Sequence, residues 1–279
     1  MLKTWLITGT SSGLGRLLAE RLLQRGDRVV ATLRREGPLV DLQEQYGNRL
    51  HVLTLDVTDF RAVRAIIAAA FEAMGRIDVV VSNAGYGLFG AAEELTDDQI
   101  DRQIATNLTG SIQLIRACLP HLRNQGGGRV LQLSSTGGQV AYPNFSVYHA
   151  TKWGIEGFVE AVSQETAAFG VDFILAEPGP TATNFSANLD RANAMPEYDA
   201  TPSGEMRRAF ANGGSLAKRD DAGDIVAQMI AAADAEHPPL RLVLGEVSYQ
   251  HIEHTLAARL GAVRAQKHPA ASCDDAGTS

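Results

Sequence analysis

The chain has 279 residues, with 25 basic and 32 acidic side chains and a formal net charge of −7 at pH 7. Its basic residues are scattered rather than clustered, which argues against a nucleic acid as a partner. The apolar run before Gly9 is too short for a signal sequence or a membrane span, so we expect a soluble cytoplasmic protein that does not bind membranes.

Short apolar runs alternate with longer segments of helical period along the chain. Near-continuous runs of Val, Leu and Ile are typical of strands buried on both faces, and this alternation predicts a parallel sheet covered by helices. The predicted fold is a doubly wound α/β domain with a seven-stranded, mostly parallel sheet and helices on both faces. Strands are expected at Trp5–Thr8, Arg28–Leu33, Leu50–Leu55, Val79–Ser82, Arg129–Ser134, Val171–Ala176 and Leu240–Leu244.

Helices are expected between these strands, at Gly13–Arg25, Leu39–Tyr46, Asp59–Met74, Asp97–Arg123, Ser146–Phe169, Ala222–Ala235 and Val247–Val263. No linker rich in Pro, Gly or Ser divides the chain, so we predict one domain over residues 1–266. Residues 181–215 lack a strand pattern, and a long irregular insertion of this kind is expected to act as a substrate lid. Residues 267–279 are small and polar and are expected to form a disordered tail.

A glycine-rich turn, Thr8-Gly-Thr-Ser-Ser-Gly-Leu-Gly15, joins the first predicted strand to the first helix. Glycines at such a turn let the backbone approach a pyrophosphate, whose charge is met by the amides at the start of the helix. The turn therefore predicts a Rossmann-type dinucleotide site, although its glycine spacing is not the standard one. The alternative is a turn that needs only positive φ angles. The cradle would consist of Gly9, Ser11, Ser12, Gly13, Leu14 and Gly15.

The end of the second predicted strand indicates which dinucleotide binds. An NAD site places an acidic residue there, whereas a 2′-phosphate needs an arginine. Here Leu33 occupies the acidic position and Arg34 follows it, so we expect NADP rather than NAD. The alternative is that Arg34 and Arg35 are only the solvated start of a helix.

A tyrosine and a lysine, Tyr148 and Lys152, lie four residues apart in a predicted helix, and Ser135 lies thirteen residues upstream of the tyrosine. Positions four apart share one helix face, so the ammonium can favour the deprotonated phenol and lower its pKa. Such a tyrosine can exchange a proton with an alcohol or carbonyl oxygen while hydride moves at the carbon. Alone, a pair of this kind also occurs by chance.

Further motifs stand in the same order as in the classical short-chain dehydrogenase/reductase family, which this chain resembles over residues 3–245. The glycine turn resembles the TGxxxGxG motif of that family, and Asn83-Ala-Gly85 resembles its NAG motif. Ser82 is a small departure, because many members have a first asparagine at that position. The remaining matches are the helix asparagine at Asn107, the catalytic serine at Ser135, the YxxxK motif at Tyr148-His-Ala-Thr-Lys152, and the PG motif at Pro178-Gly179 with Thr183 after it.

The resemblance implies a catalytic role for four of these residues. Tyr148 would be the acid in reduction and the base in oxidation, and Lys152 would lower its pKa and bind the nicotinamide ribose. Ser135 would donate to the substrate oxygen. Its neighbour Ser134 is the rival, but the thirteen-residue offset from Tyr148 favours Ser135. Adjacent strand residues face opposite ways, so only one of the two can reach the site. Asn107 would hold a water that links Lys152 to solvent; the alternative is a polar helix residue at a bend.

Further residues would line the cofactor in a protein of this family. Asp56 and Val57 would contact the adenine, although a strand-end cap is an alternative for Asp56. The other expected contacts are Asn83, Ala84, Gly85, Pro178, Gly179 and Thr183, with the last three beside the nicotinamide. These motifs should converge at the carboxyl ends of the strands.

The substrate is expected to be apolar or aromatic. Residues 181–215 should close over it together with 86–89 and 140–145, and basic side chains do not cluster there. The apolar groups of the insertion are Phe185, Met195, Tyr198, Met206 and Phe210. The helices from Asp97 and from Ser146 are apolar around much of their circumference, and the family pairs them between subunits, so a homodimer or homotetramer is expected.

The leading hypothesis is an NADP-dependent oxidoreductase that interconverts a ketone or aldehyde with its alcohol. One alternative is an NADP-binding redox sensor without turnover, and another is an epimerase or dehydratase. No metal site is expected, because Cys118 and Cys273 lie far apart and the histidine spacing fits no metal motif. We expect His149, His251 and His254 to be surface residues.

Overall fold

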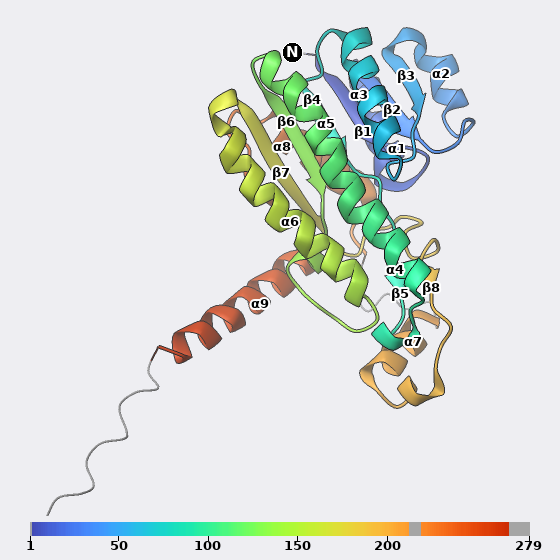
Figure 1. Ribbon diagram of the computed structural model, residues 1–279, viewed down its shortest axis with the longest axis vertical. Helices are drawn as coiled ribbons and strands as arrows, with labels where there is room; N and C mark the ends of the chain where they lie inside the picture. The colour runs from blue at the N-terminus through green and yellow to red at the C-terminus, as the bar shows by residue number, and fades with distance from the viewer. Residues whose placement is uncertain (1, 212–218, 268–279) are drawn as a thin grey trace, which may run out of the picture.

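The computed structural model describes residues 2–211 and 219–267 (Figure 1). A seven-stranded sheet has the order β3-β2-β1-β4-β6-β7-β9, and every neighbouring pair is parallel. The predicted doubly wound Rossmann-type fold is confirmed. The strands are β1 (Thr4–Thr8), β2 (Arg28–Leu33), β3 (Leu50–Thr54), β4 (Val79–Ser82), β6 (Gly128–Leu133), β7 (Val171–Pro178) and β9 (Arg241–Leu244).

Helices cover both faces of this sheet, as the sequence pattern predicts. Helices α3, α5 and α6 lie together in front of the sheet in Figure 1, and α9 extends away from the body. The helices are α1 (Gly13–Arg25), α2 (Val40–Tyr46), α3 (Phe60–Met74), α4 (Asp97–Gln103), α5 (Ser111–Asn124), α6 (Ser146–Thr166), α7 (Pro202–Ala211), α8 (Ala222–Asp234) and α9 (Glu246–Ala265).

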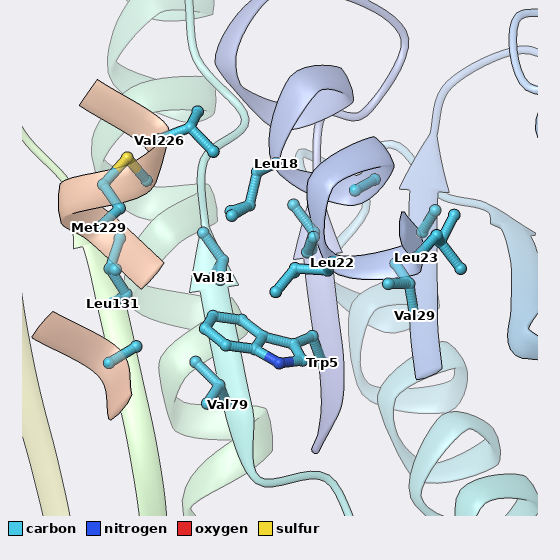
Figure 2. Packing of buried hydrophobic residues seen from close by; sticks show 14 of the residues in the cluster. Trp5, Leu18, Leu22, Leu23, Val29, Val79, Val81, Leu131, Val226 and Met229 are labelled. Carbon is cyan, nitrogen blue, oxygen red and sulfur yellow. The ribbon is translucent and has the colours of Figure 1, made fainter. Parts of the chain in front are cut away.

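Alternation along the strands divides the core into two layers. Trp5 and Ile7 of β1 pack on one face of the sheet against α1 and α8, whereas Leu6 packs on the other face against α3, α5 and α6. Figure 2 shows the first layer, in which the Trp5 ring lies between β4 and α1 near Val79 and Leu22. With apolar packing on both faces, the sheet holds the carboxyl ends of its strands in fixed positions.

The long helix predicted at Asp97–Arg123 has the expected extent but not the expected continuity. Its middle, Ile104–Gly110, is a π-helical stretch between α4 and α5. The prediction of one regular helix was wrong because side-chain periodicity does not report a shift in backbone hydrogen bonds. Such widened turns occur frequently at functional sites, and this one contains Asn107.

The expected irregular insertion contains more regular structure than we predicted. Strand β8 (Asp190–Arg191) pairs with β5 (Leu88–Phe89), and α7 begins at Pro202. Proline is favoured at the first position of a helix, and Gly204 fits because a Cβ there would lie 2.3 Å from the Asp199 carbonyl oxygen. Residues 212–215 of the insertion, and the predicted tail except Lys267, lie outside the described residues.

None of the described helices combines the length and the apolar character that crossing a membrane requires. Within the same residues, no group of His, Cys, Asp and Glu side chains could hold a metal ion. Cys118 is buried in α5.

We expect Trp5→Ala to lower the free energy of unfolding by about 3–5 kcal/mol, because the fully buried indole would leave a cavity beneath the sheet. Urea denaturation measures this change. The control Val263→Ala, at a side chain that is 64% exposed, should change the same free energy by less than about 0.5 kcal/mol. A Trp5→Ala loss as small as that of the control would contradict the packing described here.

Candidate active site

The carboxyl ends of β1, β4, β6 and β7 open into one cavity of about 1150 Å³. That volume can hold a dinucleotide together with a small substrate. Two residues predicted for the site, Gly15 and Asn107, do not line it, whereas the others do. Those that line it are Gly9, Ser11, Ser12, Gly13, Leu14, Arg34, Asp56, Val57, Asn83, Ala84, Gly85, Ser135, Tyr148, Lys152, Pro178, Gly179 and Thr183.

The glycine turn presents backbone amides to the cavity. Gly9 and Gly13 have φ angles of 72° and 59°, which favour glycine. A Cβ on Gly9 would lie 2.8 Å from the Ala84 Cα. Helix α1 begins at Gly13, and its N-cap, Ser12, makes no side-chain capping hydrogen bond, so the helix start is open to an anion. The turn fits a pyrophosphate.

Asn83 fixes the point where β1 and β4 separate. Its side-chain amide donates to the carbonyl oxygens of Thr8 at 2.8 Å and Gly9 at 3.0 Å. The Thr8 hydroxyl in turn accepts from the backbone amides of Asn83 and Ala84. Gly15 lies beneath this junction, and a Cβ there would lie 2.4 Å from the Asn83 Nδ2. Gly15 therefore supports the turn from below and does not face the cofactor cavity.

The cavity is also lined by Leu33, the last residue of β2, and by Arg34, which follows it. Leu33 is buried, and Arg34 is exposed and lines the cavity. Arg35 does not line it. Arg16 of α1 is engaged elsewhere, because its guanidinium pairs with Glu20 and Asp41. Arg34 is thus placed to meet an anion in the cavity.

Asp56 and Val57, which follow β3, lie on the same wall of the cavity as Arg34. One carboxylate oxygen of Asp56 accepts from the amide and the hydroxyl of Thr58. This is the strand-end turn that we gave as the alternative for Asp56. The Asp56 side chain is exposed, while Val57 is buried.

Tyr148 and Ser135 meet at the centre of the cavity. Tyr148 comes from the first turn of α6, and Ser135 follows β6. The Ser135 hydroxyl is near enough to Tyr148 to oppose the rise in pKa that burial causes. The Ser135 Oγ also accepts from the Gly137 amide at 3.0 Å. Ser134 points the other way and donates to the Glu156 carboxylate. The two serines therefore face opposite sides, as strand geometry requires, and Ser135 is the one beside the tyrosine.

Lys152 lies one helical turn after Tyr148 and donates to the Leu133 carbonyl oxygen at 2.8 Å. Its Nζ is 5.7 Å from the centre of the Tyr148 ring. Burial lowers the pKa of Lys152 to about 8, and the negative charge of Glu156 opposes that fall. Burial also raises the pKa of Tyr148 to about 12, although the hydrogen bond to Ser135 opposes the rise. The expected lowering of the tyrosine pKa was wrong for this structure, because desolvation dominates.

A buried carboxylate, Glu156, continues the same face of α6 one turn after Lys152. It accepts from Ser134, from Gln139 Nε2 at 2.6 Å and from Arg241 Nη1 at 2.7 Å. Arg241 of β9 also pairs with Glu177, whose pKa burial raises to about 7. Glu156 was missed in the sequence, although its four-residue spacing from Lys152 was a visible signal.

Asn107 lies behind the cavity wall and is buried. Its amide donates to the Tyr86 carbonyl oxygen at 2.8 Å and accepts from the Tyr86 amide at 3.1 Å. Gln103 Nε2 donates to the same carbonyl. The Asn107 side chain, from the π-helical stretch, thus fixes the loop that follows Gly85 through two hydrogen bonds to the Tyr86 backbone.

The cofactor wall beyond the tyrosine is formed after β7. The Gly179 amide donates to the Leu244 carbonyl oxygen of β9 at 3.2 Å, and this ties Pro178-Gly179 to the sheet edge. Thr183 stands at the start of the insertion, where its hydroxyl accepts from the Phe185 amide at 3.3 Å. The exposed side chains of Arg219 and His251 lie at the same opening. Neither was predicted for the site.

Aromatic and aliphatic side chains surround the Tyr148 hydroxyl. Phe145 lies 5.9 Å from the Tyr148 ring, and so does Phe185. Met195 and Tyr198 do not line the cavity, contrary to our expectation. The Met195 amide donates to Glu94 and the Tyr198 hydroxyl to Glu93, so both anchor the insertion. The apolar lining is Tyr142, Phe145, Phe185, Leu189, Met206 and Phe210.

His149 is a buried residue, and the prediction of a surface histidine was wrong. Its Nδ1 lies 2.8 Å from the Gly137 carbonyl oxygen, and its Nε2 accepts from the Tyr142 amide at 3.2 Å. His251 and His254 are exposed, as expected. The helical pattern around His149 does not indicate its burial, because the loop that covers this residue precedes the helix and folds back over it.

Comparisons with known proteins agree with this geometry. A family model described as short chain dehydrogenase matches residues 3–194. The oxidoreductase BOA17 of Botryotinia fuckeliana is 36% identical over 250 residues, which cover 88% of this chain and 89% of that protein. Estradiol 17-beta-dehydrogenase 1 of Rattus norvegicus is 34% identical over 252 residues, which cover 85% of this chain and 72% of that protein.

A solved short-chain dehydrogenase from Streptomyces avermitilis has the same fold over its whole length. It is 33% identical, covers 98% of each chain and superposes with a TM-score of 0.88. The family match spans well over half of the sequence and includes the turn, the asparagine motif and the tyrosine–lysine pair. The chain belongs to the short-chain dehydrogenase family and is an oxidoreductase of the class that acts on CH–OH groups.

Proposed function

We propose that this oxidoreductase reduces a ketone or an aldehyde to its alcohol with NADPH, and that Tyr148 supplies the proton. The observation that carries the proposal is that Tyr148, Ser135 and Lys152 line the same cavity as the glycine turn. When bound, the nicotinamide supplies the hydride. The residues that would hold the cofactor are those of the turn, the Asn83 loop and the segment after β7.

The hydroxyl groups of Ser135 and Tyr148 would have different roles at the substrate oxygen. Ser135 accepts from the Gly137 amide, so its own hydrogen is available to the substrate oxygen and can stabilise the charge that develops there. Tyr148, with its pKa raised to about 12, is protonated at neutral pH and is the proton donor. Reduction requires this protonated form.

Lys152 would bind the nicotinamide ribose and hold positive charge beside Tyr148. With its pKa lowered to about 8, the Lys152 amine is mostly charged at pH 7 and loses its charge as the pH rises through about 8. After transfer, the phenolate would be stabilised by the nearby ammonium. We also propose that Asn107 holds a water through which the proton lost by Tyr148 is replaced. The Asn107 side chain positions the loop that contains Tyr86.

NADP is the proposed cofactor, in preference to NAD. The support is the pairing of a buried apolar residue, Leu33, with an exposed guanidinium, Arg34, where an NAD site would carry a carboxylate. Arg34 would clamp the 2′-phosphate by charge-assisted hydrogen bonds. Val57 and Asp56 would flank the adenine.

The proposed substrate is apolar or aromatic. Phe145, Phe185 and Phe210 supply an apolar wall around Tyr148, which suits a carbonyl group attached to a ring or a chain. Residues 181–211 would act as the lid, since Phe185 and Met206 of that segment reach the wall. We also propose a homo-oligomer, because Ile104 and Trp153 leave apolar surface exposed near α4 and α6.

We expect Tyr148→Phe to lower kcat about 10³-fold and to leave the Kd for NADPH within about twofold, because the ring stays and only the proton donor is lost. Steady-state NADPH oxidation over a panel of aryl ketones, aldehydes and quinones measures kcat, and fluorescence titration measures the Kd. The control Tyr249→Phe, at an exposed tyrosine of α9, should change neither. Unimpaired turnover by Tyr148→Phe would refute the proton donor.

We expect Arg34→Ala to weaken NADPH binding about 10- to 100-fold and to leave NADH binding within about twofold, because only the 2′-phosphate loses its partner. Titration of both cofactors against both proteins measures these constants. The neighbouring Arg35→Ala should affect neither, since Arg35 does not line the cavity. Equal weakening of NADPH and NADH by Arg34→Ala would argue against NADP selectivity at this residue.

We expect NADPH affinity to fall as the pH rises through about 8, because Lys152 loses its charge there. Tyr148 cannot cause this change, since its pKa is raised to about 12. Binding titrations between pH 6 and pH 10 measure the effect, with Lys152→Met as the variant that should show weak, pH-independent binding over that range. A wild-type affinity that stays level to pH 10 would contradict the assignment.

A further inference from the structure

His149 joins two points of the loop that connects β6 to α6. This loop, residues 135–145, carries Ser135 at one end and two cavity-lining aromatic residues, Tyr142 and Phe145, at the other. The imidazole Nδ1 lies 2.8 Å from the Gly137 carbonyl oxygen, and Nε2 lies 3.2 Å from the Tyr142 amide nitrogen. One side chain of the helix therefore spans the loop near both of its functional ends.

The partners of the two ring nitrogens define the state of the imidazole. A carbonyl oxygen can only accept, so Nδ1 carries the hydrogen, and a backbone amide can only donate, so Nε2 is the bare nitrogen. A proton on Nε2 would face the Tyr142 N–H and remove that hydrogen bond. Burial also lowers the pKa of His149. The loop contact thus needs the neutral ring.

Gly137 transmits this contact to the catalytic serine. Its carbonyl oxygen meets His149, while its amide donates to the Ser135 Oγ at 3.0 Å. The three groups are tightly packed: a Cβ on Gly137 would lie 2.8 Å from the His149 Nδ1 and 3.2 Å from the Tyr148 Cε1. A displacement of His149 would therefore move the residue that orients Ser135 toward Tyr148.

Tyr142 transmits the contact to the substrate wall. Its ring meets the His149 ring edge to face at 4.4 Å, with an interplanar angle of 88°, and lies 5.5 Å from Phe145. The rings that contact His149 are those of Tyr142, Phe145 and Tyr148. Burial raises the pKa of both tyrosines. Among the described residues, these ring contacts therefore place no charge against the imidazole at neutral pH.

The other charged groups near this loop belong to a neighbouring contact. Glu156, from the same helix, packs under Gly138, donates no hydrogen and is bonded to Ser134, Gln139 and Arg241. Arg241 of β9 pairs with Glu156, and also with Glu160 and Glu177. Burial raises the pKa of Glu177 to about 7, so acidification also acts on this network, which reaches the loop at Gln139. The Tyr142 amide is bonded to His149, and its hydrogen exchange therefore reports on the imidazole.

We propose that His149 is a positioning residue that clamps the loop 135–145 to α6, so that Ser135 faces Tyr148 and Tyr142 completes the substrate wall. The clamp releases when the imidazole becomes protonated, which couples the shape of the substrate wall to pH. This rests on the proposed catalytic roles of Ser135 and Tyr148. It predicts separate effects on kcat through Gly137 and on KM through Tyr142.

Steady-state kinetics with NADPH and 4-nitrobenzaldehyde test the two halves of the clamp. His149→Ala removes both contacts, and kcat/KM should fall about 10- to 100-fold, while the Kd for NADPH stays within about twofold. His149→Asn keeps a donor for the Gly137 carbonyl oxygen but no acceptor for the Tyr142 amide. It should restore most of kcat and leave KM raised. The matched control His254→Asn, at an exposed residue of α9, should change neither constant.

Hydrogen exchange of the Tyr142 amide tests the clamp without any turnover. In the wild type at pH 7 we expect protection of this amide, with loss of protection in His149→Ala and in His149→Asn. Protection in the wild type should also fall on acidification, after correction for intrinsic exchange, together with a rise in KM. The fall should come at a pH below the ordinary range for histidine, because burial lowers the pKa of His149. His149→Asn should show a raised KM with no further rise at acid pH.

Two results would overturn the proposal. One is a change of less than twofold in kcat and KM for His149→Ala, together with an unchanged hydrogen-exchange rate of the Tyr142 amide. The other is a parallel loss of activity and NADPH binding in every His149 variant, which indicates only a folding role. If the wild type binds NADPH but reduces no carbonyl compound, the proposed function fails, and the exchange experiment still decides whether the clamp exists.

Discussion

The buried carboxylate of Glu156 is the constraint on which the arrangement of the site depends. It joins α6 to β6 through Ser134, to the following loop through Gln139, and to β9 through Arg241. A carboxylate that is almost fully buried must be paired in this way, because unpaired burial of a charge is very costly. The pairing fixes both the height and the rotation of α6. Tyr148 and Lys152, two turns and one turn earlier, are thereby aligned with the end of β6.

Burial then determines how the aligned groups behave. The same apolar packing that holds the helix removes water from Tyr148 and Lys152, and it raises the pKa of the phenol while lowering that of the amine. The result is a protonated tyrosine beside a lysine that is close to losing its charge. The protonated tyrosine can donate a proton. It lines the same cavity as the glycine turn that would bind the cofactor.

The sequence predicted what depends on local pattern. The strands and the glycine turn follow from residue type and apolar pattern, and the structure places them as expected. The choice of Ser135 over Ser134 also needed its spacing from Tyr148, because strand alternation alone says only that one of the two serines faces the site. The π-helical stretch at Asn107 changes backbone hydrogen bonds without changing side-chain period. The burial of His149 depends on how the loop before its helix folds back over it, and the bonds of Glu156 depend on a strand residue, Arg241, that is distant in the chain. The predicted direction of the Tyr148 pKa shift was wrong for the same reason, since desolvation is set by the whole fold.

The central claim is that NADPH reduces a carbonyl carbon at this site while the protein supplies the proton. The most direct measurement uses NADPH carrying deuterium at C4, prepared separately with each of the two stereochemical placements, and follows the label in the product by mass spectrometry. The account predicts that one of the two cofactors places one deuterium on the carbinol carbon for each NADPH oxidised. Oxidation of NADPH with no label on that carbon from either cofactor would contradict it.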